Sequence, residues 1–239
     1  MRLDKLIANC GFGSRKEAKA LCKKGLVTVD GVVVRRSEAH IDPECNRVCV
    51  GEHVIEYEKY SYLMMNKPAG VISATFDEEH QTVVDLLEER YIYANVFPVG
   101  RLDLDTTGLL ILSNDGGFAH RALSPKKKVA KIYHARVDKP ITDSEIKAFG
   151  EGVTLDDGYK CLPAKLEAPE DFDDFAKVEI YEGKYHQVKR MFAALGIRVI
   201  SLKRVEFAGL TLDEGLAPGD YRRLNEDELK IISNLLSKD

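Results

Sequence analysis

An acidic turn between two apolar runs constrains this chain more than any other feature. Residues 100–110 read Gly-Arg-Leu-Asp-Leu-Asp-Thr-Thr-Gly-Leu-Leu, and apolar runs occupy 96–99 and 109–112. This pattern predicts a strand, a tight turn and a second strand, and such a turn can hold a carboxylate rigidly. Asp103 and Asp105 are therefore candidates for chemistry, although the same pattern also fits a solvated hairpin whose charges only face water.

The composition indicates a globular protein with room for one large domain or two unequal ones. The chain has 239 residues, of which 44% are hydrophobic and 31% charged. No apolar run approaches the roughly 20 residues of a membrane helix, and the opening Met-Arg-Leu-Asp-Lys is too polar to begin a secretory signal. We therefore expect a cytoplasmic protein that does not enter a membrane.

The cysteines favour neither a disulfide framework nor a zinc site. The chain has five cysteines, an odd number, and no Cys-x-x-Cys pair. Cys45 and Cys49 have no His or second cysteine pair at a suitable spacing. Structural thiols are the expectation, because an unpaired cysteine usually behaves as a small hydrophobic residue.

The charges are segregated along the chain although the net charge is only −4. Residues 1–36 carry nine basic groups against three acids, while 121–137 and 184–204 each carry six basic groups and no acid. The acids gather in 138–182, where thirteen face five lysines, and they include the loop 167–174. This distribution indicates a basic face for a polyanion and an acidic back, which the net charge alone would not suggest.

The first 40 residues predict two helices followed by a hairpin. Residues 3–9 form a short amphipathic pattern, and Ser14 with Glu17 makes a capping box for a second helix that stops at Gly25. Two short strands then flank Asp30-Gly31, a strong hairpin signal.

This unit resembles the alpha-L RNA-binding motif of ribosomal protein S-four. The resemblance rests on Arg2-Leu3-Asp4-Lys5, Ser14-Arg15, Glu17-Ala18 and the run 25–31. It implies RNA as a partner without implying a reaction. Basic residues that recur at helical spacing can line a phosphate backbone, although an exposed amphipathic helix explains the same spacing. The predicted RNA-binding residues are Arg2, Lys5, Arg15, Lys16, Lys19 and Lys23.

A polar linker at Glu56-Tyr57-Glu58-Lys59 predicts domains 1–58 and 59–239. In the second domain, Lys67 should stand at the end of a strand that runs into a Pro-Ala-Gly turn, although a surface lysine is the simpler interpretation. A helical stripe over 82–91 predicts core. Further predicted elements are helices at 118–123, up to Gly196 and at 226–236, and strands at 131–137, 198–205, 207–212 and 221–224.

The strand 131–137 places Tyr133 and His134 on opposite faces. Tyr133 shares its face with Lys131 and can present an aromatic surface beside positive charge, which suits base stacking. A tyrosine in a strand can equally be core. His134 is expected to be structural or an RNA contact.

Four segments together resemble the pseudouridine synthase superfamily. They are Lys67-Pro68-Ala69-Gly70, the run 100–110, Lys131-Ile132-Tyr133 and the run 183–191, in this order and spacing. With the alpha-L unit in front, nearly the whole chain is similar to the RsuA-like branch. The fold implied is α+β, a small RNA-binding domain ahead of a catalytic domain with a mixed, largely antiparallel sheet flanked by helices. Tyr185-His186-Gln187-Val188-Lys189-Arg190 is closer to the enzymes of small-subunit ribosomal RNA than to the large-subunit members.

The resemblance implies isomerisation of a uridine to pseudouridine in small-subunit ribosomal RNA. Asp103 would be the nucleophile, acting at the ribose C1′ or at C6 of the base. Lys189, or Arg190 as the second choice, would hold it ionised, and Arg101 and Tyr133 would bind the flipped nucleotide. No cofactor is implied. The expected partner is ribosomal RNA, in a ribonucleoprotein assembly intermediate, and the expected protein is a monomer.

Four alternatives stay open at this point. An Asp-x-Asp pair could hold a divalent metal in a sugar-nucleotide transferase, or serve as the carboxylate pair of a glycosidase. Neither explains the basic segments, and we interpret Asp105 as a residue that organises the turn by capping backbone N–H groups. The chain could also modify large-subunit RNA, or be a non-catalytic assembly factor that binds ribosomal RNA.

Overall fold

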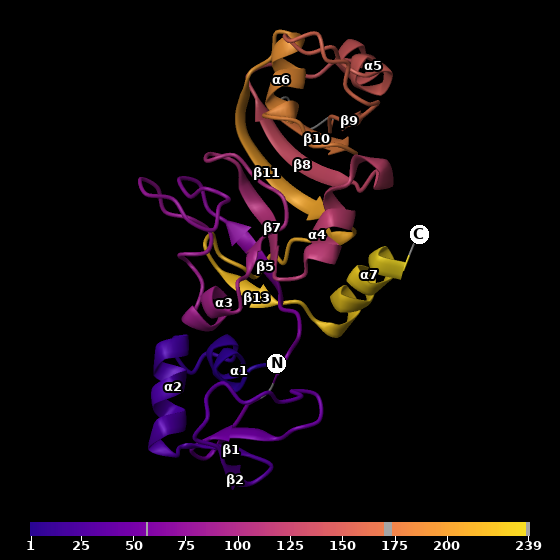
Figure 1. Cartoon of the computed structure of the whole chain (residues 1–239). Coiled ribbons are helices and arrows are strands. Elements are labelled where there is room, and N and C mark those ends of the chain that lie inside the picture. Colours follow the sequence, from indigo (N-terminus) through magenta and orange to yellow (C-terminus); the bar gives the residue numbers. More distant parts are fainter. Residues whose placement is uncertain (56, 170–173, 238–239) are drawn as a thin grey trace. The chain divides into compact units, whose positions relative to one another are not determined.

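The computed structural model describes residues 1–55, 57–169 and 174–237 (Figure 1). Its contacts divide the chain into an N-terminal unit, residues 1–61 with 84–97, and a C-terminal unit, residues 62–83 with 98–239. The segment 84–97 thus belongs to the N-terminal unit although it lies beyond Glu58, and the division into domains 1–58 and 59–239 stays a prediction. Glu56 of the predicted linker and 170–173 of the predicted acidic loop lie outside the described residues.

The two helices predicted at the N-terminus are confirmed as α1 (Leu3–Asn9) and α2 (Arg15–Lys24). Ser14 caps α2: its hydroxyl accepts from Glu17 N (3.3 Å), and Glu17 Oε2 accepts from Ser14 N (2.7 Å). Gly25 ends the helix with φ +75°, a left-handed conformation that glycine adopts without steric cost.

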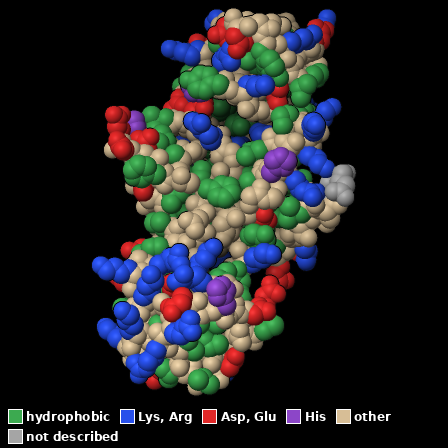
Figure 2. Space-filling view, in the orientation of Figure 1, with side chains coloured by type: hydrophobic (Ala, Val, Ile, Leu, Met, Phe, Trp, Pro, Cys, Tyr) green, Lys and Arg blue, Asp and Glu red, His purple; other side chains and the backbone are tan. Residues whose placement is uncertain are grey.

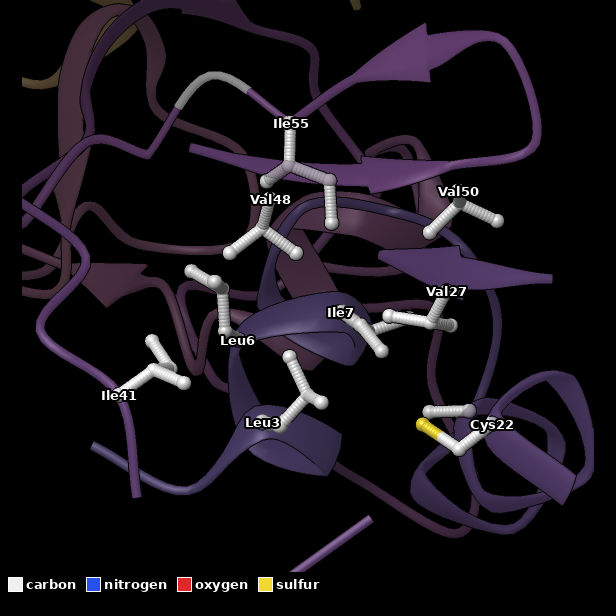
Figure 3. Packing of buried hydrophobic residues seen from close by; sticks show 10 residues of the cluster. Leu3, Leu6, Ile7, Cys22, Val27, Ile41, Val48, Val50 and Ile55 are labelled. Carbon is white, nitrogen blue, oxygen red and sulfur yellow. The ribbon is translucent and has the colours of Figure 1, made fainter. Parts of the chain in front are cut away.

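The N-terminal sheet has the order β2-β1-β3-β4 and pairs antiparallel throughout. Its strands are β1 (Val27–Val29), β2 (Val32–Val33), β3 (Val48–Val50) and β4 (His53–Val54). Asp30 and Gly31 both have positive φ between β1 and β2, which confirms the predicted hairpin. In Figure 3, Leu6 and Ile7 of α1 lie among Val27, Val48 and Ile55, so the helix covers this sheet with its apolar side.

All five cysteines are free, as predicted. Cys22 is part of the N-terminal core, and Cys161 is buried in the C-terminal unit. Cys45 is exposed, so burial does not extend to every thiol.

The helix predicted over 82–91 is largely wrong. A helix, α3 (Glu89–Tyr93), begins only at residue 89. Thr82 forms a bridge with Ile72, and Val83 N donates to Ile72 O (3.0 Å). The backbone of residues 82–83 therefore pairs with Ile72, which lies outside the predicted helix. The β-branched side chains of Thr82 and Val83 favour this extended conformation. Burial of the apolar stripe itself is confirmed.

The main sheet of the C-terminal unit runs β13-β5-β7-β11-β8-β10-β9, and β12 adds to β11. Only the β7–β11 pair along this path is parallel, which confirms the mixed, largely antiparallel sheet. The strands are β5 (Tyr62–Lys67), β7 (Thr107–Ser113), β8 (Lys131–Val137), β9 (Lys165–Glu167), β10 (Phe175–Ile180), β11 (Val199–Phe207), β12 (Leu210–Thr211) and β13 (Tyr221–Arg223).

Helices accompany this sheet at several points (Figure 1). They are α4 (Gly116–Leu123), the short 3-10 helix η1 (Pro125–Lys127), α5 (Asp143–Glu151), α6 (Gln187–Ala194) and α7 (Glu226–Ser237). α4 packs with α7, α5 with β9 and α6 with β11. α5, β9 and β10 lie in the acidic segment 138–182, for which the sequence analysis predicts no elements.

The parallel pairing of β7 with β11 fixes the position of the acidic turn that holds Asp103. Gly108 at the start of β7 pairs with Arg204 of β11. A Cβ at Gly108 would lie 2.2 Å from Arg204 O, and φ is +97° there, so the close approach requires glycine. Ahead of the turn, β6 (Phe97–Pro98) occupies the predicted first strand, and Val99 N donates to Ile111 O (2.7 Å). The predicted strand, turn and strand are confirmed.

Within the part of the chain that the structure describes, none of the helices has the length and apolarity that membrane crossing needs.

Candidate active site

Asp103 lies in the turn that leads into β7. Thr106 N donates to Asp103 O (3.1 Å), and the Thr106 hydroxyl donates to Asp103 Oδ2 (3.4 Å). The carboxylate is one-quarter exposed (25%). It is therefore fixed by its own turn and still accessible to a substrate.

The buried ammonium group of Lys67 holds the backbone of the Asp103 turn in place. Lys67, the last residue of β5, is fully buried, so it is not the surface lysine of the simpler interpretation. Its Nζ donates to the carbonyl oxygens of Pro68 (2.9 Å), Asp103 (3.1 Å) and Thr106 (3.0 Å), with a longer contact to that of Leu104 (3.4 Å). Burial lowers the pKa of Lys67 to about 8, and the carboxylates of Asp103 and Asp105 offset that effect only in part.

Ser73 holds the other end of the turn. Its buried hydroxyl donates to Leu102 O and accepts from Leu102 N, both at 3.0 Å. Gly70 N donates to Leu104 O (2.8 Å). Gly70 of the Lys-Pro-x-Gly motif and Ser73 after it thus satisfy backbone groups of the turn on both sides of Asp103. This role of Ser73 was not predicted, because nothing in the sequence pairs it with residue 102.

Lys189 of α6 joins the two carboxylates of the turn. Its Nζ lies 3.0 Å from Asp103 Oδ2 and 2.5 Å from Asp105 Oδ1. Burial lowers the pKa of Lys189, but the hydrogen bonds to Asp105 and Asp103 outweigh it and leave the pKa raised. The hydrogen bond from Lys189 in turn lowers the pKa of Asp105. The structure thus brings together Asp103 and Lys189, and it gives Asp105 an ion pair with Lys189 that the sequence analysis does not predict.

His186 is a neighbour of Asp103 that sequence reasoning missed. Its Nε2 lies 3.5 Å from Asp103 Oδ1. The residue precedes α6 in a left-handed conformation, φ 48° and ψ 33°, and its ring stacks on that of Tyr185. Its place three residues before Lys189 was the available signal, because one turn of chain can bring both side chains to the same carboxylate.

Arg190 does not reach Asp103. It pairs with Asp157 (2.7 Å) and Asp156 on the loop before β9. Consecutive residues of a helix point about 100° apart, so Lys189 and Arg190 cannot both face the turn. The substrate-binding role of Arg190 stays a prediction.

Tyr133 is buried on the C-terminal sheet. It is 7% exposed and lies between Arg204 of β11 and Val178 of β10 in register. Lys131 is buried on the same face, and burial, with Arg204 nearby, lowers its pKa to about 8. Arg101 is exposed at the start of the turn. Stacking by Tyr133 and phosphate binding by Arg101 remain predictions.

The predicted RNA-binding residues all belong to the N-terminal unit, over which Lys and Arg side chains gather in Figure 2. Arg2 and Arg15 both donate to the buried carboxylate of Asp4. The four predicted lysines are exposed: Lys5, Lys16, Lys19 and Lys23. Outside Glu56, 170–173 and 238–239, no group of three or more His, Cys, Asp or Glu side chains is placed to hold a metal ion.

Comparison with known proteins decides the family. A model described as RNA pseudouridylate synthase matches residues 61–194, and an S4 domain model matches residues 1–44. The chain belongs to the RNA pseudouridylate synthase family. It is an isomerase of uridine in RNA, with an S4 domain in front, as the sequence analysis predicts. The matched region contains the turn of Asp103 together with Tyr133 and Lys189.

Full-length relatives agree with this family. The chain is 48% identical to "Uncharacterized RNA pseudouridine synthase YtzG" of Bacillus subtilis, over 98% of each chain. It is 43% identical to "Ribosomal small subunit pseudouridine synthase A" of Vibrio cholerae, over 97% of this chain and 99% of the relative. A solved structure titled "Crystal structure of pseudouridylate synthase" aligns at TM-score 0.68 and 33% identity, covering 97% of this chain and 99% of that one.

Proposed function

We propose that this pseudouridine synthase isomerises a specific uridine of small-subunit ribosomal RNA, with Asp103 as the nucleophile. The observation that carries the proposal is the pairing of Asp103 with Lys189 at 3.0 Å, in a turn that Lys67 and Ser73 clamp. An opposite charge at this distance favours the ionised carboxylate, which is the form that can attack.

The chemistry needs only the substrate's own atoms. After the uridine leaves its stack, the Asp103 carboxylate attacks C1′ of the ribose or adds to C6 of the base. The N1–C1′ bond breaks, the uracil turns, and C5 bonds to C1′. The proton then leaves C5 and N1 gains one, so atoms and electrons balance. In the C1′ route the new C5–C1′ bond displaces the carboxylate from C1′, and in the C6 route elimination releases it from C6, so Asp103 returns to its starting state in both.

Other residues of the C-terminal unit bind the substrate in this proposal. Tyr133 stacks on the uracil, and its hydroxyl is a candidate for removing the C5 proton. Arg101 contacts the phosphate of the flipped nucleotide, and Arg190 supports RNA binding beside it. The basic side chains of the S4 domain bind the RNA backbone.

The small-subunit assignment is supported by relatives named ribosomal small subunit pseudouridine synthase A, at 39–43% identity and near full length. The sequence Tyr185-His186 before Gln187 is consistent with that branch. We also propose that the enzyme acts in the cytoplasm as a monomer, on ribosomal RNA within an assembly intermediate.

The test is pseudouridine mapping on unmodified ribosomal RNA, without added metal or cofactor. Small-subunit RNA is supplied naked and with ribosomal proteins, and large-subunit RNA is supplied in parallel. We expect one modified uridine in small-subunit RNA, none with Asp103→Asn, and retained activity with Asp105→Asn in the same turn. Modification of large-subunit RNA alone would overturn the substrate, and an active Asp103→Asn variant would overturn the mechanism.

A further inference from the structure

We propose that Tyr185, supported by His186, is a stacking platform for the nucleobase next to the target uridine. The proposal rests on Asp103 being the reacting carboxylate. It adds a binding site for the flanking sequence to the site that holds the uridine itself.

The two rings form a pair with one open face. Their centroids are 3.8 Å apart and their planes differ by 18°, which is a stacked arrangement. Tyr185 is 75% exposed, among the most exposed large hydrophobic residues of the described chain. A flat aromatic ring of this kind accepts any base, because every base has a π face.

His186 connects the stacked pair of rings to the carboxylate of Asp103. One side of the imidazole stacks on Tyr185, while its Nε2 lies 3.5 Å from Asp103 Oδ1. The left-handed backbone of His186 is uncommon for a residue with a Cβ, and such conformations concentrate at functional sites. The exposed ring is thus held one side chain away from the reacting group.

Tyr185 and Tyr133 suit different bases. Tyr133 is 7% exposed within the sheet, so it fits a base that has been flipped into a closed site. Tyr185 presents its ring to solvent, so it fits a base that remains in the strand beside the flipped one. Unstacking the target leaves its neighbour without a stacking partner, and the Tyr185 ring can replace that partner.

Positive charge beside the platform suits the connecting phosphates. Lys184 precedes Tyr185 and is exposed, with its Nζ 4.7 Å from the centroid of the Tyr159 ring, whereas Lys189 is already paired with Asp103 and Asp105. Single-stranded RNA sites combine such charge with exposed aromatic rings. The occupant that fits both features is a nucleotide of the substrate strand.

The experiment uses the full-length enzyme and a small-subunit RNA fragment that carries the mapped uridine. Three RNAs are compared: the natural fragment, one abasic on the 5′ side of the target and one abasic on the 3′ side. Tyr185→Ala is compared with Tyr185→Phe, which keeps the ring, and with Tyr181→Ala. Tyr181 lies four residues earlier, and its hydroxyl donates to Glu179 (2.8 Å).

We expect Tyr185→Ala to raise KM about tenfold on natural RNA with kcat nearly unchanged, as loss of one stacked base implies. On one of the two abasic RNAs the same substitution should change KM less than about twofold. Tyr185→Phe and Tyr181→Ala should behave like the wild type on all three.

An unchanged KM on natural RNA, or an equal effect of Tyr185→Ala on all three RNAs, would overturn the platform. An active Asp103→Asn variant would count against the proposed mechanism instead. If the wild type is fully active, Asp103→Asn is inactive and Tyr185→Ala has an unchanged KM, the stacking platform is rejected and the proposed mechanism is not.

Discussion

Nζ of Lys189 lies 3.0 Å from Oδ2 of Asp103, and the same atom lies 2.5 Å from Oδ1 of Asp105. One ammonium therefore serves two carboxylates of different exposure, since Asp103 is 25% and Asp105 74% exposed. The exposed partner is screened by water, so the partly buried contact to Asp103 should matter more for catalysis.

Replacing Lys189 should slow the chemical step more than replacing Asp105. Lys189→Met removes the cation that favours ionised Asp103, and loss of one such charged contact typically lowers kcat by about a hundredfold or more. Asp105→Asn leaves the Lys189–Asp103 pair and should lower kcat less than about tenfold. Single-turnover rates on saturating RNA measure both. Equal losses for the two variants would show that the ion pair acts as a unit.

Lys67→Met should loosen the turn that carries Asp103. The substitution leaves the carbonyl oxygens of Asp103 and Thr106 without their buried donor, which costs about 1–3 kcal/mol of unfolding free energy. Because a small displacement of a reacting group can cost about a hundredfold in rate, activity should fall further than stability suggests. Denaturant unfolding and single-turnover kinetics separate the two effects. Lys147→Met, at an exposed site on α5, is the control and should change neither.

The burial of Lys67 also predicts a pH dependence. Its pKa is about 8 in the folded protein against 10.5 for the free side chain, so between these values the unfolded chain binds more protons. The contribution of Lys67 to the free energy of unfolding should therefore rise between pH 8 and pH 10.5, by up to about 3 kcal/mol. Activity should change in the opposite direction above pH 8, because a neutral amine has only two N–H donors for the turn's carbonyls.

The comparison of wild type with Lys67→Met at pH 7, 8, 9 and 10 isolates this effect. Lys131, whose pKa is also about 8, titrates in both proteins and cancels. The stability difference should shift in favour of the wild type as the pH rises. A constant difference would show that the ammonium of Lys67 does not titrate in this range.

Features that depend on neighbouring residues could be predicted from the sequence. The capping box of Ser14 and Glu17, the Asp30-Gly31 hairpin and the strand Lys131–Val137 each follow from a local pattern, and each is present. The missed helix α5 carries such a signal as well. Thr142 and Glu145 form its capping box, a local pattern of the same kind as that of Ser14 and Glu17.

Features that depend on contacts between distant segments could not be predicted in this way. Thr82 and Val83 have a helical pattern, but the structure engages them with Ile72. The contacts of Lys67 to the carbonyl oxygens of Asp103, Leu104 and Thr106 arise only when β5 and β7 pair, and no local pattern contains them. The family motif predicts Lys189 beside Asp103, whereas the direction of Arg190 toward Asp156 depends on how α6 is oriented.

Gly108→Ala should destabilise the C-terminal unit strongly. The new Cβ would lie 2.2 Å from Arg204 O, which only a shift of β7 against β11 can relieve, and the φ of +97° adds strain. We expect a loss of about 3 kcal/mol or more, with reduced activity because the shift moves the Asp103 turn. Gly158→Ala is the matched control: its φ is +82°, but nothing lies within 4 Å of the added Cβ. Its loss should be about 1 kcal/mol, and equal losses would exclude the close contact as the cause.

Asp4→Asn should destabilise the N-terminal unit. The Asp4 side chain is fully buried and accepts from Arg2 (2.8 and 3.1 Å) and Arg15 (3.1 Å). Burial raises the pKa of Asp4, but the hydrogen bonds from Arg2 and Arg15 outweigh it and hold the pKa below 3.8. A carboxyl group with a lowered pKa contributes stability above its unfolded pKa and loses it as the pH falls through the folded pKa. Asp4→Asn should therefore cost about 1–3 kcal/mol near pH 7.

Hydrogen exchange of the amides in α1 and α2 of the full-length protein measures this loss within the N-terminal unit. Faster exchange is expected there and not in β5 or β7 of the C-terminal unit. Asp227→Asn, at an exposed position of α7, is the control and should leave α1 and α2 unchanged. The stability of the wild type over Asp4→Asn should stay constant from pH 7 to pH 5. This advantage should shrink below about pH 3.8, where Asp4 takes up a proton in the unfolded chain. An advantage that persists unchanged into that acid range would show that the charge of the Asp4 carboxylate is not the source of the stability lost in Asp4→Asn.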